Sequence, residues 1–378
     1  MNAIVNGKIL LPDGIAEHHA LLYTNKIVGL VPTDQLPPDT VCIDAHGGYV
    51  AAGLIDLHIH GYGGVDVCNS DPDDLRRLDA MLLQNGVTGW LATTVTADED
   101  TLGRTFDTCR TVMAEGGHAL LGVHAEGPYV NAAKAGAQTP SHIRRPDPDF
   151  IKENADVIRL LTLAPEMDDD FAAIRAIKES TDVVLSMGHT DADYDVAAEG
   201  IKAGVTHTTH LFNAMSSLHH RQPGAVGAAL TSDVSCELIA DRHHVHPALY
   251  DMVWRLKGRR LCLVTDCLAA AYAPDGFGKL GDRFVGWHGG GQCYLEDGKA
   301  GGGPLAGTAL RLWEAVANLC DHSSIPLWEC FNCASLNPAT VLGIADRKGS
   351  LEPGKDADII IAGLYFKPTT IIVGGKIV

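Results

Sequence analysis

Five short segments of the 378-residue chain place imidazole or carboxylate side chains directly after apolar, strand-like runs. The first segment reads Asp56-Leu57-His58-Ile59-His60, and the side chains of a β-strand alternate between its two faces. Asp56, His58 and His60 are therefore predicted to share the inner face of a strand, while Leu57 and Ile59 point the other way. Two imidazoles on one face of a strand can converge on a metal ion.

Each of the other four segments contains a donor of the same chemical kind at or near its end. The segments are His124-Ala125-Glu126-Gly127-Pro128, Gly188-His189-Thr190, His207-Thr208-Thr209-His210 and Val264-Thr265-Asp266. A single histidine or carboxylate at such a position is usually a core, capping or solvated residue. Several such strand ends in one chain instead favour a metal centre. Imidazole and carboxylate donors without thiolate suit zinc, iron, manganese or cobalt, and the pattern does not choose among these metals.

Helix-length segments separate the apolar runs, which is the pattern of parallel strands joined by crossover helices. Eight runs occur, at residues 53–60, 89–96, 120–126, 157–165, 183–189, 206–211, 236–241 and 261–266. Eight β/α repeats predict an α/β fold of the (β/α)8 TIM-barrel type, and no GxGxxG motif follows an early strand. The carboxyl ends of all strands in such a barrel surround one site, which would bring the polar residues together.

The two ends of the chain resemble each other. Residues 4–10 and 372–378 both look like short strands broken by a turn dipeptide. With further strand-like runs near both ends, they predict a small β-sandwich domain formed from both chain termini. We expect residues 1–48 and 346–378 to form this domain and residues 49–345 to form the barrel that carries the metal centre.

Composition excludes several classes of function. The formal net charge is −18 and no run of Lys or Arg could follow a phosphate backbone, so no nucleic-acid partner is expected. No stretch of about 18 apolar residues occurs and the N-terminus lacks signal-peptide features, which predicts a cytoplasmic protein with no membrane partner. The ten cysteines are scattered and are expected to be reduced thiols.

Longer motifs surround the polar strand ends along nearly the whole chain. They include His58-Ile59-His60-Gly61, Glu126-Gly127-Pro128, His210-Leu211-Phe212-Asn213-Ala214-Met215 and His219-His220-Arg221-Gln222-Pro223-Gly224. The HxH pair alone is moderately specific, whereas EGP, HLFNAM and HHRQPG together are highly specific. On these motifs the chain resembles the N-acetylglucosamine-6-phosphate deacetylases of the amidohydrolase superfamily.

The resemblance implies a metal site and a catalytic residue. It makes Asp266 the catalytic carboxylate and implies three core metal ligands, which are Glu126, His189 and His210. Family members with histidines at the positions of His58 and His60 look able to hold a second metal. One or two divalent ions per chain are therefore expected, with zinc favoured and iron, manganese or cobalt as alternatives.

The resemblance also implies a set of substrate contacts. Arg221 and His244 match positions that hold the sugar phosphate. The other matched positions are Ala137, Gln138, Asn213, Ala214, Leu305, Ala306 and Gly307. Gln138 stands where some family members have a carbonyl-polarising histidine; its amide can donate a hydrogen bond but cannot become cationic. Arg242 and Cys267 also depart from the family pattern, which often has Gly and Ala there.

The activity implied is hydrolysis of the acetamide of N-acetyl-D-glucosamine 6-phosphate to D-glucosamine 6-phosphate and acetate, in amino-sugar catabolism. The expected partner is thus a small-molecule amino-sugar phosphate, and a homo-oligomer, dimer or tetramer, is expected. The nearest alternative is the same reaction on N-acetylgalactosamine 6-phosphate. A cyclic-amide amidohydrolase would typically have a metal-bridging Lys at the end of strand four, which residues 157–165 lack. A non-catalytic metabolite-binding barrel is the alternative from another class; such proteins usually lose ligands that this chain retains.

Overall fold

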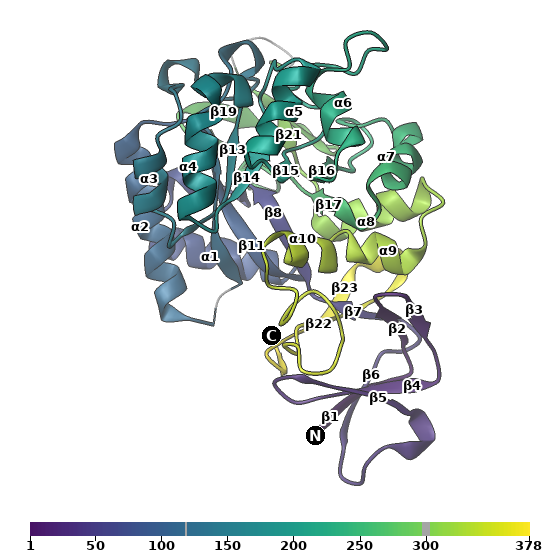
Figure 1. Ribbon diagram of the computed structural model, residues 1–378. Helices are drawn as coiled ribbons and strands as arrows, with labels where there is room; N and C mark the ends of the chain where they lie inside the picture. Colours follow the sequence, from purple (N-terminus) through teal and green to yellow (C-terminus); the bar gives the residue numbers. More distant parts are fainter. Residues whose placement is uncertain (118, 297–302) are drawn as a thin grey trace.

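The computed structural model describes residues 1–117, 119–296 and 303–378, which form two regions (Figure 1). Strands from both chain ends form the smaller region, drawn in purple and yellow at the bottom of the view. The larger region is a strand barrel surrounded by helices. In the part of the chain that the structure describes, no helix has the length and apolar character needed to cross a membrane.

Eight parallel strands form the barrel. Each barrel strand after the first pairs with the barrel strand that precedes it in sequence. They are β8 (Leu54–Ile59), β11 (Val87–Thr94), β12 (Leu120–Glu126), β13 (Ile158–Leu163), β14 (Val184–Met187), β15 (His207–Thr208), β16 (Ser235–Ile239) and β17 (Leu261–Val264). The last strand lies beside the first, since the Asp266 backbone N–H donates to His58 O at 2.9 Å. The predicted (β/α)8 barrel is therefore confirmed.

Helices follow the barrel strands and cover their outer side (Figure 1). They are α1 (Pro72–Leu83), α2 (Glu99–Glu115), α3 (Pro148–Glu153), α4 (Ala172–Ser180), α5 (Tyr194–Ala203), α6 (Gly224–Thr231), α7 (Tyr250–Lys257), α8 (Leu312–Asp321), α9 (Leu327–Asn332) and α10 (Leu336–Val341). The first two are capped by the preceding residues Asp71 and Asp98, whose side chains accept hydrogen bonds from backbone N–H groups of the first turn. Such caps satisfy donors that have no partner within the helix.

Two small sheets carry the strands of the chain ends. One contains β5 (Ile27–Pro32), β4 (His19–Tyr23), β1 (Asn2–Val5) and β6 (Val41–Asp44). The other contains β24 (Lys376–Ile377), β23 (Pro368–Val373), β22 (Ile359–Ala362), β7 (Tyr49–Ala52), β2 (Lys8–Leu11) and β3 (Gly14–Ala16). Ile4 and Leu21 of the first sheet and Ile359 of the second belong to one buried cluster, as a sandwich requires.

A further antiparallel sheet lies between β17 and α8 in sequence, and sequence analysis did not predict it. Its strands are β18 (Phe277–Leu280), β19 (Arg283–Gly286), β20 (Gln292–Leu295) and β21 (Leu305–Thr308). Its first and last strands supply Leu280 and Leu305 to the wall of the barrel pocket. The two-residue strand pair β9 (Gly61–Tyr62) and β10 (Val65–Asp66) follows β8.

Candidate active site

A pocket of about 390 Å³ opens at the carboxyl ends of the barrel strands. Its wall contains twelve of the residues that sequence analysis singled out, which are His60, Glu126, Ala137, Gln138, His189, His210, Asn213, Ala214, His244, Asp266, Leu305 and Ala306. The volume lies within the range of small-molecule sites, about 300–1,000 Å³. The ends of several strands therefore meet in one cavity, as expected for a barrel of this type.

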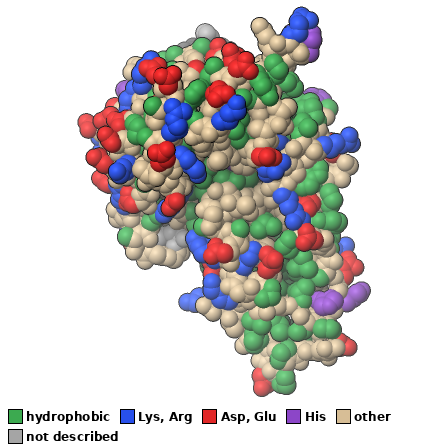
Figure 2. Space-filling model, viewed as in Figure 1, with side chains coloured by type: hydrophobic (Ala, Val, Ile, Leu, Met, Phe, Trp, Pro, Cys, Tyr) green, Lys and Arg blue, Asp and Glu red, His purple; other side chains and the backbone are tan. Residues whose placement is uncertain are grey.

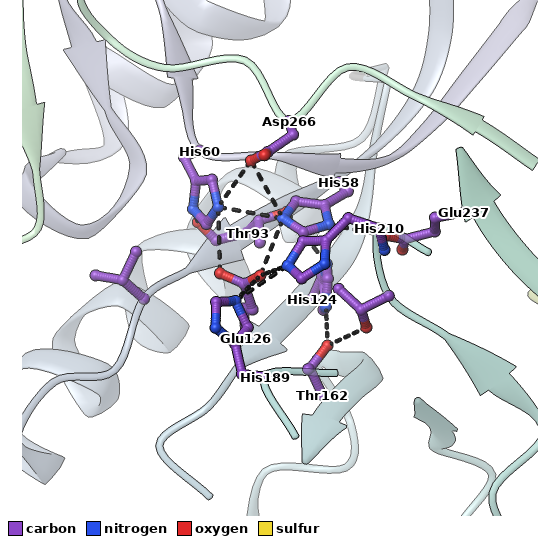
Figure 3. A network of polar contacts seen from close by, with 12 residues as sticks. His58, His60, Thr93, His124, Glu126, Thr162, His189, His210, Glu237 and Asp266 are labelled. Atoms are coloured by element: carbon purple, nitrogen blue, oxygen red, sulfur yellow. Dashed lines mark hydrogen bonds and ion pairs between the residues drawn. The ribbon is translucent and has the colours of Figure 1, made fainter. Parts of the chain in front are cut away.

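Glu126, His189 and His210 converge at the floor of the pocket (Figure 3). Glu126 Oε1 lies 3.1 Å from His189 Nε2 and 3.0 Å from His210 Nε2. The two Nε2 atoms are 3.0 Å apart, and all three side chains are buried. Three ligand atoms this close to one another can all contact the same ion.

His58, His60 and Asp266 form a second group beside the first. His58 Nε2 lies 3.2 Å from His60 Nε2, and Asp266 Oδ1 lies 3.6 Å and 3.5 Å from these two atoms. Glu126 joins the groups, since its Oε2 is 3.4 Å from His60 Nε2 while its Oε1 faces the first group. The Glu126 carboxylate therefore lies between the two groups.

Hydrogen bonds at Nδ1 of His60 and His189 determine which nitrogen of each ring carries the proton. His60 Nδ1 donates to Thr93 O at 3.2 Å, and His189 Nδ1 donates to Lys134 O at 2.8 Å. A neutral ring that donates from Nδ1 leaves a lone pair on Nε2. The lone pairs therefore point into the cluster, where they require a proton or a metal ion as partner.

The spacing of the donor atoms fits a metal centre. In a tetrahedral site with bonds of about 2.0–2.2 Å, the ligand atoms lie about 3.3–3.6 Å apart. The imidazole and carboxylate atoms of the two groups lie 3.0 to 3.6 Å apart. Their nitrogen and oxygen chemistry is also that of zinc and the other first-row divalent metals.

The electrostatics of the cluster favour positive charge. Burial opposes ionisation of Glu126, but His189 and His58 outweigh it and hold the pKa of this carboxyl well below its usual range. Burial also disfavours a charged His189, yet Glu126 raises the pKa of that imidazole. His189 therefore lies in the negative potential of the ionised Glu126 carboxylate, and that carboxylate would also attract a divalent cation.

Several of these residues have left-handed backbone conformations. His189, His210 and Asp266 have φ angles of 47°, 30° and 49°, and Ala214 of the pocket wall has 50°. Arg242, which follows the end of β16, has a φ of 70°. Residues other than glycine rarely adopt such φ angles, and those that do are concentrated at functional sites.

Gln138 contacts the cluster directly. Its side-chain oxygen accepts the Thr96 backbone N–H at 2.6 Å, and its Nε2 donates to Glu126 Oε2. The contact to the backbone fixes which end of the amide faces Glu126. One further N–H of the Gln138 amide is therefore available to a ligand in the pocket.

The two residues matched to the sugar phosphate lie in different places. His244 lines the pocket, and its Nδ1 lies 2.7 Å from Asp241 Oδ2. Burial lowers the pKa of His244, but the hydrogen bond and charge of Asp241 outweigh burial and raise it above the ordinary value. Arg221 does not line the pocket.

Arg221 belongs to the loop between β15 and α6, which projects from the barrel (Figure 1). Figure 2 shows basic and histidine side chains at the tip of a projection in the same position. The Arg221 guanidinium donates to His220 Nε2 at 2.7 Å, and Arg221 and Lys134 line a separate hollow of about 700 Å³. The contact of Arg221 with a sugar phosphate stays a prediction.

Three other residues singled out from the sequence lie outside the pocket wall. His58 is fully buried beneath it, and Gly307 packs against the Asp266 backbone. Asp56 accepts a hydrogen bond from Thr265 Oγ1 at 2.7 Å, so it joins β8 to the end of β17. Burial raises the pKa of Asp56 to about 7.

Sequence analysis missed several residues that contact the donor set, among them Thr93, Lys134 and Glu237. Lys134 lines the pocket and accepts the His189 hydrogen bond on its backbone carbonyl. Glu237 accepts a hydrogen bond from His58 Nδ1 at 2.9 Å. A carboxylate between Cys236 and Leu238, inside an apolar strand-like run, was the available signal for Glu237. Nothing comparable marks Lys134, because its contact uses a backbone atom.

Comparisons with known proteins agree with this architecture. Residues 49–378 match the model of the amidohydrolase family. The chain is 38% identical to the N-acetylglucosamine-6-phosphate deacetylase of Bacillus subtilis (strain 168), over 91% of this chain and 86% of that protein. It is 33% identical to an N-acetylgalactosamine-6-phosphate deacetylase of Escherichia coli O157:H7, over 93% of both chains.

Solved structures show the same likeness. The crystal structure of N-acetylglucosamine-6-phosphate deacetylase from Pasteurella multocida superposes with a TM-score of 0.94 at 32% identity, covering 100% of this chain and 99% of that one. Barrel, donor set and family model together define an amidohydrolase. Within that class, the chain belongs to the N-acetylglucosamine-6-phosphate deacetylase family.

Proposed function

We propose that the protein is a metal-dependent deacetylase that converts N-acetyl-D-glucosamine 6-phosphate to D-glucosamine 6-phosphate and acetate. The observation that carries this proposal is the buried convergence of Glu126, His189 and His210 at the floor of a pocket that also holds Asp266. The names of the similar proteins support the choice of substrate.

Glu126, His189 and His210 would hold one divalent ion, and His58, His60 and Asp266 would surround a second. The donor chemistry favours zinc, with iron, manganese or cobalt as alternatives. A divalent ion bound there lowers the pKa of a water molecule and polarises the amide carbonyl. The protein's own side chains must supply proton transfer and orientation.

Asp266 is the proposed general base and acid. Its carboxylate faces the pocket beside the histidine pair and has limited exposure. It would accept the proton of the attacking water and deliver a proton to the departing amine nitrogen, so the reaction needs no covalent enzyme intermediate. The remaining amide N–H of Gln138 would donate to the acetyl oxygen as negative charge develops there.

Cationic groups at the pocket wall would hold the phosphate. His244, whose charged form Asp241 stabilises, and Lys134 both line the cavity. Hydrogen bonds between a cation and a phosphate are stronger than those between neutral groups. Asn213 and Ala214 of the loop after His210 lie on the same wall and would contact the sugar.

A second substrate has a specific observation in its favour. The similar protein of Escherichia coli O157:H7 is named for N-acetylgalactosamine 6-phosphate. Acetate release should therefore be measured with both 6-phosphate epimers and with both unphosphorylated sugars, on protein of known metal content. We expect the highest kcat/KM with the glucosamine derivative. Faster turnover of the galactosamine epimer would change the substrate, and equal rates without phosphate would contradict a sugar-phosphate enzyme.

Three properties of the whole protein belong to the same proposal. β7 pairs with β2 and β22, so we place the start of the barrel domain after Ala52 rather than at residue 49.

We propose a homo-oligomer, in which the projecting loop of Arg221 would meet a second chain. A cytoplasmic location would suit the substrate, because a sugar phosphate carries a charge of about −2 and does not cross membranes unaided.

A further inference from the structure

Glu237 is a fully buried carboxylate inside the barrel that the proposed reaction does not use. It lies on β16, between the apolar residues Cys236 and Leu238. Its Oε2 accepts hydrogen bonds from His58 Nδ1 at 2.9 Å and from the His210 backbone N–H at 3.0 Å. Figure 3 shows it on the side of His58 away from Asp266.

These two hydrogen bonds connect Glu237 to both donor groups. An ionised carboxylate can only accept, so His58 Nδ1 must donate and a neutral His58 presents its Nε2 lone pair to His60 and Asp266. The bond to the His210 backbone holds the chain where it turns with a φ of 30°. One side chain thus orients ligands of both groups.

The charge of Glu237 lacks a basic partner of fixed charge. In the ranges that the structure describes, its ion pairs are with two imidazoles, His58 at 2.9 Å and His207 at 3.4 Å, and none is with Lys or Arg. Burying a carboxylate is costly unless a positive charge compensates it. A cation held at the other nitrogen of His58 would provide that compensation through the ring.

We propose that Glu237 is the positioning residue of a second metal ion held by His58 and His60. It selects the metal-binding tautomer of His58, raises the basicity of that ring, and balances the charge of the ion. This inference rests on the proposed metal-dependent function. Carboxylate partners of this kind change metal affinity by about 10–100-fold.

The substitution Glu237→Gln tests charge without changing shape. A glutamine oxygen can still accept from His58 Nδ1 and from the His210 backbone, and its amide can donate to His207 Nε2. A residue that only joined strands would tolerate this exchange with unchanged metal binding. Asp79→Asn is the matched control, because Asp79 is also buried and its Oδ1 accepts from Trp90 Nε1 at 2.7 Å, away from the donor set.

The experiment is a titration of metal-free protein with Zn²⁺ in a metal buffer, read by bound zinc per chain and by the rise in melting temperature. We expect two ions in the wild type and in Asp79→Asn. In Glu237→Gln the first ion should bind normally and the second about 10–100-fold more weakly, with the melting temperature of the metal-free protein little changed. Equal affinities in wild type and Glu237→Gln would overturn the inference.

Two further outcomes separate this inference from the proposed function. A wild-type protein that binds one ion and releases acetate would overturn the second-metal inference and keep the deacetylase. A wild-type protein that binds no zinc and releases no acetate would contradict the proposed function itself.

Discussion

Three histidines of the cluster, His58, His60 and His189, have a hydrogen-bond partner at Nδ1 and direct Nε2 toward the other donors. His189 donates from Nδ1 to a backbone carbonyl and directs Nε2 toward Glu126. The sequence could identify His189 as a candidate because it follows a strand-like run. It could not reveal the Lys134 carbonyl, because any residue supplies a carbonyl and only the folded loop places it.

The catalytic assignment of Asp266 gives the first prediction. Asp266→Asn keeps the size of the side chain but cannot accept the proton of the attacking water. We expect kcat to fall by roughly 10²–10⁴, the usual contribution of a positioned acid or base. Steady-state kinetics at matched metal content measures the effect. A kcat within twofold of the wild-type value would remove Asp266 from the reaction.

His244 gives a pH-dependent prediction. Asp241 raises the pKa of His244, so the cation persists above the ordinary histidine pKa of about 6.5 and is lost as pH rises through the raised value. We expect KM for the phosphorylated substrate to increase over that rise, while KM for the unphosphorylated sugar stays constant. In Asp241→Asn the increase should begin at lower pH. Superimposable pH profiles of KM in wild type and variant would contradict this role.

Among the elements, regular strands were predicted more accurately than irregular ones. All eight barrel strands lie within or near their expected ranges, because apolar runs that alternate with helices leave few other arrangements. β15 is shorter than residues 206–211, since the chain turns at His210. The sheet of β18 to β21 was missed, because its strands are four residues long and both Phe277–Leu280 and Arg283–Gly286 contain a glycine and a charged residue.

The two terminal turn dipeptides behave differently. Gly374 and Gly375 join β23 and β24 as an antiparallel pair. Asn6 and Gly7 instead separate β1 and β2, which pair with strands of different sheets. The local sequence is alike at both ends, so the difference comes from the neighbouring strands rather than from the turn.

β21 lies in close backbone contact with Asp266, the proposed catalytic residue. A Cβ atom at Gly307 would lie 2.7 Å from the Asp266 carbonyl oxygen. We therefore expect Gly307→Ala to displace β21 or Asp266, and a displacement near 1 Å can slow catalysis by about 100-fold. The measurement is kcat, with bound metal determined in parallel.

Gly103→Ala is the matched control for this substitution. Gly103 lies in α2 and a Cβ there would meet no atom within 4 Å. The exchange should stabilise the helix by about 0.8–1 kcal/mol and leave kcat unchanged. Equal kcat values for the Gly307→Ala and Gly103→Ala variants would show that β21 does not position Asp266.

At the scale of the whole molecule, the acidic surface and the local site are compatible. The net charge of −18 disfavours nucleic acid as a partner, and acidic and basic side chains are interspersed over the face in Figure 2. Phosphate recognition depends instead on a few cations at one cavity. Net charge argues only against a nucleic-acid partner, and it could not predict that Arg221 lies outside the pocket of its own chain.

Metal binding should also stabilise the whole fold. The ligands come from strands that are distant in sequence, so the unfolded chain lacks the site and an ion favours the folded state. At a metal concentration of 100 times Kd, the stabilisation is about 2.7 kcal/mol per site. Thermal unfolding should therefore show a lower Tm after chelation and recovery on adding metal. An unchanged Tm would indicate that the folded protein holds no tightly bound ion.

The central claim is that a metal ion held by Glu126, His189 and His210 enables this chain to remove an acetyl group. The most direct measurement is acetate release from N-acetyl-D-glucosamine 6-phosphate by one protein sample before chelation, after chelation and after addition of zinc. We predict that chelation abolishes release, that zinc restores it in the wild type, and that zinc does not restore it in His189→Ala. Undiminished acetate release from chelated protein shown to be metal-free would contradict the claim.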